Sequence, residues 1–124
     1  MTCFWDGILH HLKEDDFERV FNCKKNNTRT RTEEFVKLLQ IKIKETKKDK
    51  YIIQSQDIRW NGEELSKQQI DEIYIHITEY NEKSVYGGYY CSTCDPFLIY
   101  ICILFNVNIN HNYCGYEMKY TNKK

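Results

Sequence analysis

The first residue that could carry chemistry is Cys3, because an amphipathic pattern begins there. Apolar residues recur after it at helical spacing, which predicts a helix over about residues 3–14. Unpaired N–H groups and the helix dipole favour a thiolate at such an N-terminus, and the same N–H groups could form part of an oxyanion hole. Cys3 is therefore a candidate nucleophile, and the alternative is a cysteine that only packs near the end of a helix.

A cysteine nucleophile needs a general base within hydrogen-bond reach, about 3 Å away. His111 is the candidate late in the sequence, and Asn112 or Asn110 could orient its imidazole ring. His10 and His11 fall about two turns further along the first predicted helix than the nucleophile. We therefore expect both of them to lie on the surface rather than in the site.

A second group of residues has the spacing of metal ligands. Cys91-x-x-Cys94 and His111-x-x-Cys114 are two pairs that could meet in a tetrahedral zinc site. The segment between the pairs reads as a buried helix and a strand, which is longer than a zinc knuckle, so the alternative is that these cysteines pack in the core or are incidental. The zinc hypothesis competes with the nucleophile hypothesis, because His111 cannot be both a zinc ligand and a free base.

Two stretches resemble the ovarian-tumour-domain (OTU) family of cysteine proteases, which have a papain-like fold. The run Cys3-Phe4-Trp5-Asp6-Gly7-Ile8 resembles the helix in which the family's catalytic cysteine precedes an aromatic, a small and an aliphatic residue. Residues 89–98 and 107–109 resemble the loop, buried helix and strand that come before its catalytic histidine. The resemblance implies a deubiquitinase-like enzyme that hydrolyses peptide or isopeptide bonds, with ubiquitin as a partner.

The sequence departs from the OTU pattern at both ends of the predicted site. The family has an acidic residue three positions before the cysteine, whereas only Met1 and Thr2 stand before Cys3. The family's catalytic histidine is followed directly by an aromatic residue, whereas Asn112 follows His111. His111 also lies one or two strands earlier in the chain than the family's histidine does. The alternative is therefore a truncated, catalytically inactive relative that acts as a binding module or a virion structural component, with or without a stabilising zinc.

The elements that must position these residues are clearest near the C-terminus. Asp95-Pro96 is an N-cap followed by proline at the first helical position, and residues 97–105 are apolar on every face. We expect this helix to be the buried centre of the fold. Residues 106–113 and 116–120 alternate between apolar and polar and are joined at Cys114-Gly115, which predicts a β-hairpin.

Two further helices and a strand are predicted between the ends. Thr30 with Glu33, and Ser66 with Gln69, have capping-box spacing before apolar stripes that run to Ile43 and Ile77. We also expect a strand over residues 51–58, followed by a turn at residues 60–62 with an exposed Trp60. His76 should lie on the surface of its helix. Residues 85–90 should form a loop that passes close to other backbone. The sequence thus predicts one α+β domain over residues 1–124, with about four helices around the buried one and a small antiparallel sheet.

Composition excludes several classes of partner. Eighteen basic and eighteen acidic residues cancel, so we expect no nucleic-acid partner, and the lysines at residues 42–50 read as a solvated helix face. No apolar run approaches the ~18 residues that span a bilayer, and no signal peptide is evident. A reducing, intracellular location follows, with cysteines as thiols or metal ligands. The composition is rich in Lys, Asn, Ile and Tyr, which indicates an AT-rich genome. Together with the OTU resemblance, this composition fits a protein of a large DNA virus, located in the host cytoplasm or in the virion.

Overall fold

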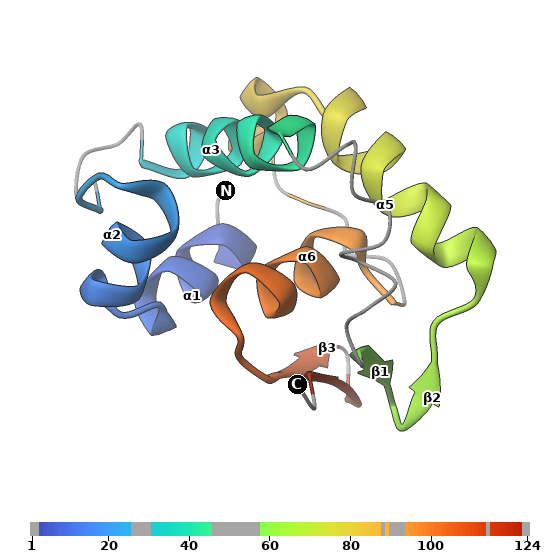
Figure 1. The fold of residues 1–124 in the computed structure, drawn as a ribbon. Helices are drawn as coiled ribbons and strands as arrows, with labels where there is room; N and C mark the ends of the chain where they lie inside the picture. The colour runs from blue at the N-terminus through green and yellow to red at the C-terminus, as the bar shows by residue number, and fades with distance from the viewer. Residues whose placement is uncertain are drawn as a thin grey trace.

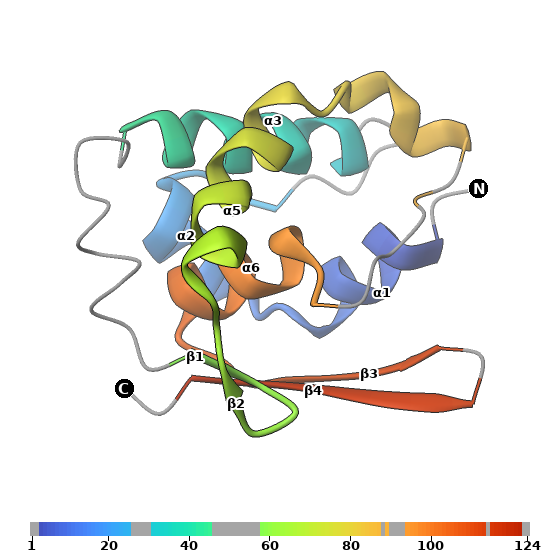
Figure 2. The same ribbon diagram turned by 90° about the vertical axis from the view of Figure 1, so that its right-hand side faces the viewer.

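A computed structural model describes residues 3–25, 31–45, 58–87, 89, 94–113 and 115–122, and for Cys3 and Tyr113 only the backbone. Over these ranges the chain is α+β, as predicted, with six helices and a four-stranded antiparallel sheet. Helices lie over one face of the sheet, and the helix α6 (Pro96–Phe105) runs between the sheet and the helix α3 (Arg31–Glu45) (Figures 1 and 2).

Helix α6 is the buried centre of the fold, as predicted from its uniformly apolar sequence. Asp95 caps its N-terminus, where one carboxylate oxygen accepts a hydrogen bond of 2.9 Å from the backbone N–H of Phe97. Pro96 follows at the first helical position, and Asn106 ends the helix in the left-handed conformation. The buried side chains come from all faces: Phe97, Leu98, Ile99, Tyr100, Ile101, Cys102 and Phe105.

The N-terminal segment forms two helices rather than one. Helix α1 (Cys3–His11) ends earlier than the predicted boundary near Glu14, and α2 (Glu14–Phe21) begins there. Asp15 and Asp16 lie in the first turn of α2. The physical reason is the helix dipole, which stabilises carboxylates in the first turn of a helix.

Helices α3 and α5 (Lys67–Glu79) pack against each other beside α6. The predicted capping box of α5 is present, with hydrogen bonds of 3.1 and 2.7 Å between Ser66 and Gln69. The other predicted box includes Thr30, which lies outside the described residues. The C-terminal end of α5 is fixed by the side-chain amide of Gln40, which donates to the backbone carbonyls of Ile77 and Tyr80.

The sheet joins two hairpins in the order β2-β1-β4-β3. Its strands are β1 (Ile58–Trp60), β2 (Glu63–Glu64), β3 (Ile109–Tyr113) and β4 (Tyr116–Asn122). Asn61 and Gly62 both have positive φ, which allows a tight turn between the first two strands. The predicted C-terminal hairpin is present, and it pairs His111 with Met118. Of the strand predicted over residues 51–58, only Ile58 is described.

Two expectations about aromatic surface residues were wrong. Residues 85–87, predicted as loop, belong to the 3₁₀ helix η1 (Glu82–Gly87), and a Cβ added at Gly87 would meet nothing within 4 Å, so no backbone approaches closely there. Trp60 lies half-buried in β1 against the core because β1 pairs with β4. None of the helices over the described ranges is long and apolar enough to cross a membrane.

Candidate functional site

A cleft of about 560 Å³ lies between α1, α6 and β3. One stripe of α1 forms a wall of the cleft, α6 contributes two residues, and the segment that leads into β3 forms another wall. The volume falls within the range of about 300–1,000 Å³ that is usual for ligand pockets. The described residues that line it are Phe4, Gly7, Ile8, His11, Leu12, Leu98, Ile101, Val107, Asn108, Ile109, Asn110 and His111.

One part of this cleft brings His111 to the first turn of α1. The imidazole ring of His111 meets the ring of Phe4 edge-on, with 5.9 Å between the ring centroids. Cys3 directly precedes Phe4 and is the first residue of α1. His111 comes from the middle of β3 and is half-buried. The residue predicted as base thus lies against the neighbour of the residue predicted as nucleophile, although 108 positions separate the two in the sequence.

Aromatic packing fixes the first turn of α1 from the core side. The ring of Tyr89 lies 4.6 Å from that of Phe4 and 5.2 Å from that of Trp5. Trp5 is fully buried, and its ring meets that of Phe97 in α6 edge-on at 4.9 Å. Phe4 therefore contacts both Tyr89 and His111, and the start of α1 is held by aromatic contacts to α6 and to β3.

Tyr89 belongs to a polar network that sequence reasoning missed. Its hydroxyl donates a hydrogen bond of 2.7 Å to the fully buried carboxylate of Asp95. Because that donation uses its single proton, it must accept the 3.0 Å bond from Nε2 of His76, so this hydrogen bond places a proton on Nε2. The backbone N–H of Asp95 donates to the hydroxyl of Tyr120. The surface position expected for His76 was therefore wrong, because Tyr89 and Phe97 pack against its ring.

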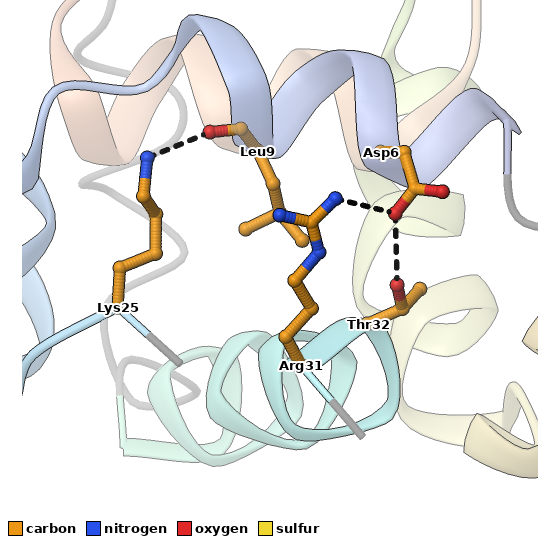
Figure 3. A network of polar contacts seen from close by, with 5 residues as sticks. All are labelled: Asp6, Leu9, Lys25, Arg31 and Thr32. Atoms are coloured by element: carbon orange, nitrogen blue, oxygen red, sulfur yellow. Dashed lines mark hydrogen bonds and ion pairs between the residues drawn. The ribbon is translucent and has the colours of Figure 1, made fainter. Parts of the chain in front are cut away.

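Polar contacts anchor α1 along the side that faces α3 (Figure 3). A carboxylate oxygen of Asp6 accepts hydrogen bonds from Arg31 at 3.0 Å and from the hydroxyl of Thr32 at 3.5 Å. At the other end of the helix, the ammonium group of Lys25 donates to the backbone carbonyls of Leu9 and Leu12 at 3.0 and 2.9 Å. A cation is favoured at that end because the carbonyls there lack helical partners.

The two asparagines proposed to orient the imidazole differ from His111 in their surroundings. Neighbouring residues of a strand point to opposite faces, and Asn110 and Asn112 are both exposed while His111 is half-buried. Asn110 also lines the cleft, but its side-chain amide donates to Glu117 at 2.7 Å. This alternation does not favour direct contact between either amide and the ring of His111.

The predicted zinc ligands are only partly described. Cys94 and His111 lie in the described ranges, whereas Cys91 and Cys114 do not. Within those ranges, no three His, Cys, Asp or Glu side chains gather as a metal site would require. Burial and the neighbouring charge of Asp95 raise the pKa of Cys94 to about 11. The four-ligand site stays a prediction, since two of its four ligands lie outside the described residues.

The other cysteines have contrasting environments. Cys102 is fully buried in α6, and burial raises its pKa to about 12 despite a hydrogen bond with the backbone of Ile109. Cys23 is exposed after α2. Thiol reactivity requires the thiolate and access to solvent, so Cys102 is protected and Cys23 is a suitable reference thiol.

We find no match to this chain among protein-family models, curated proteins or solved structures. The case for a function rests on the geometry of the cleft and on the residues that line it. Sequence reasoning missed the role of Gly7 in this cleft, although Phe4, Gly7, Ile8 and His11 stand at helical spacing beside the buried stripe of the same helix.

Proposed function

We propose that this chain is an OTU-like cysteine peptidase in which Cys3 is the nucleophile and His111 the general base. The observation that carries the proposal is the edge-on contact of 5.9 Å between His111 and Phe4 beside the cleft. Cys3 is the adjacent residue and begins α1, where the helix dipole favours a thiolate. A nucleophile and a base from distant parts of the chain at one open cleft are the arrangement that covalent hydrolysis needs.

The chemistry would proceed in two steps. The thiol proton passes to His111, and the sulfur attacks the carbonyl carbon of the scissile bond. Backbone N–H groups in the first turn of α1 stabilise the resulting oxyanion, after which the C–N bond breaks and His111 protonates the leaving amine. Water then hydrolyses the thioester, which releases a carboxylate and restores the thiol. We do not assign the orientation of the imidazole to Asn112, because its side chain is exposed.

The OTU resemblance supports a ubiquitin-linked peptide or isopeptide as the substrate. The balance of eighteen basic and eighteen acidic residues fits a protein partner better than a nucleic acid. Three of the described cysteines, Cys23, Cys94 and Cys102, are free thiols, which accords with the reducing environment of a cytoplasm.

A ubiquitin-based suicide probe tests the proposal. The full chain should form one covalent adduct at Cys3, and both Cys3→Ala and His111→Ala should abolish it. Cys23→Ala is the matched control, because it removes an exposed thiol outside the cleft and should leave the adduct unchanged. No adduct, or an adduct that survives Cys3→Ala, would contradict the proposal.

The exposure of Asn112 favours a second candidate, an inactive relative that binds ubiquitin or serves as a virion component. For that candidate we expect no adduct, but ubiquitin binding that Cys3→Ala leaves unchanged. A structural zinc is compatible with it, because His111 would then not have to act as the base of a cysteine nucleophile. Metal analysis of protein purified without chelator should in that case find about one zinc per chain, and Cys91→Ser should remove it.

A further inference from the structure

The fold does not explain why position 7 is glycine. Gly7 lies inside α1, where glycine is among the least favourable residues. Its φ is not positive, unlike those of Gly62 and Gly115. A Cβ added at Gly7 would meet nothing within 4 Å. Neither backbone conformation nor packing therefore requires a glycine at this place.

The cleft supplies a reason. Gly7 is exposed and lies in the cleft wall, on the same stripe of α1 as Phe4 and His11. Leu98 and Ile101 of α6 line the same space. A larger side chain at position 7 would extend into the cleft and not into the core. We propose that this part of the cleft is a subsite for a bulky apolar side chain of the peptide substrate, and that Gly7 keeps it open.

The lining identifies the class of side chain. Most of the described lining residues are apolar, and none of them is Lys, Arg, Asp or Glu: Phe4, Ile8, Leu12, Leu98, Ile101, Val107 and Ile109 make up the apolar part. A Lys or Arg side chain would lose its hydration there without finding an opposite charge, because none of the described lining residues is a carboxylate. A Leu or Phe side chain would instead exchange contact with water for contact with these residues.

The subsite lies close to the proposed nucleophile. Gly7 is four residues after Cys3, so it lies about 6 Å further along the helix axis at 1.5 Å per residue. The identification of the occupant as a substrate residue rests on the proposed peptidase activity.

Peptide binding to the Cys3→Ala protein tests the subsite without any chemistry. The probes are acetylated tripeptide amides with Phe, Gly or Lys at the central position, titrated by NMR. The Phe peptide should bind about tenfold more tightly than the Gly or Lys peptide, and Gly7→Leu should remove that preference. His10→Leu is the matched control, because it adds the same side chain at an exposed position of α1 outside the cleft and should keep the preference.

The same variants separate this inference from a general effect on folding and from the proposed activity. Gly7→Leu and Gly7→Ala should melt no lower than the parent, since both replace glycine with a better helix former in open space. Equal binding of the Phe and Gly peptides, or a preference that survives Gly7→Leu, would overturn the subsite even if the suicide probe labels Cys3. If the Phe peptide is preferred in a way that depends on Gly7, but the suicide probe does not label Cys3, the cleft is an apolar peptide-binding site and the peptidase proposal is contradicted.

Discussion

The N-termini of α6 and α1 both lie close to a cysteine, and their surroundings differ. At α6, the buried carboxylate of Asp95 accepts the 2.9 Å bond from the N–H of Phe97 and the 2.7 Å bond from Tyr89. At α1, the cysteine itself is the first helical residue, and the open cleft and His111 lie beside that turn.

The environment of Cys94 indicates that a nearby helix N-terminus does not by itself activate a cysteine. Cys94 is next to the cap of α6, yet burial and the charge of Asp95 raise its pKa to about 11. The terminus of α6 stabilises a structural carboxylate, so the adjacent thiol keeps its proton at neutral pH. The proposed reactivity of Cys3 depends on solvent access and on a base, which the cleft and His111 would supply beside the first turn of α1.

Asp95→Ala should have the largest effect on stability. The change removes an N-cap and leaves the hydroxyl of Tyr89 and the N–H of Phe97 without their buried acceptor. We expect a loss of about 2–4 kcal/mol in the free energy of unfolding, measured with urea. Asp15→Ala, at an exposed position in the first turn of α2, is the control and should cost less than about 1 kcal/mol. Equal losses in the free energy of unfolding for Asp95→Ala and Asp15→Ala would contradict a distinct structural role for the N-terminus of α6.

Tyr89→Phe should have a smaller effect, because it keeps the ring that packs on Phe4 and loses only the hydroxyl. The hydrogen bonds to Asp95 and from His76 are lost, so we expect a decrease of about 1–2 kcal/mol in the free energy of unfolding. Combined with Asp95→Ala, the two changes should cost less than their sum, since they remove a shared bond. Strict additivity would show that the hydroxyl acts independently of Asp95.

The raised pKa of Cys102 predicts that the free energy of unfolding falls at alkaline pH and is unaffected by this thiol at neutral pH. Burial raises the pKa of Cys102 from 9.0 to about 12, so the folded protein holds the proton that the unfolded chain releases. The stability contributed by this thiol is complete below about pH 9 and is lost as the pH rises toward 12. The free energy of unfolding should therefore fall by about 1 kcal/mol between pH 8 and pH 10 from this group. Cys102→Ala should show a shallower fall over the same range, and an identical slope would show that the thiol does not contribute.

Local signals in the sequence were sufficient for the elements whose contacts are local. The cap and proline at residues 95–96 predicted the start of α6, and alternation predicted the hairpin of β3 and β4. The pairing of Trp60 with Tyr120 was not predictable, because contacts between distant segments leave no periodic pattern in either one. The same holds for His76, whose partner Tyr89 follows thirteen positions later, beyond the end of its helix.

The candidate site also combines features that local sequence signals predict with features that depend on contacts between distant segments. Residue type and helix position were enough to nominate Cys3 and His111, but the contact between Phe4 and His111 depends on how α1 packs against β3. The orienting role of Asn112 was inferred from closeness in sequence, which in a strand places neighbouring side chains on opposite faces. The sequence around Gly7 does not predict a cleft, because the cleft forms only where α1 packs near α6 and β3. The open space beside Gly7 is therefore visible only in the structure.

The most direct test of the central claim is the rate at which iodoacetamide alkylates each cysteine at neutral pH, followed by mass spectrometry. An activated Cys3 should react at least about tenfold faster than the exposed Cys23, and His111→Ala should remove that advantage without changing Cys23. Cys94 should react slowly, because its raised pKa keeps it protonated. Equal rates for Cys3 and Cys23, or a fast Cys3 that His111→Ala leaves unchanged, would contradict the assignment of these two residues as nucleophile and base.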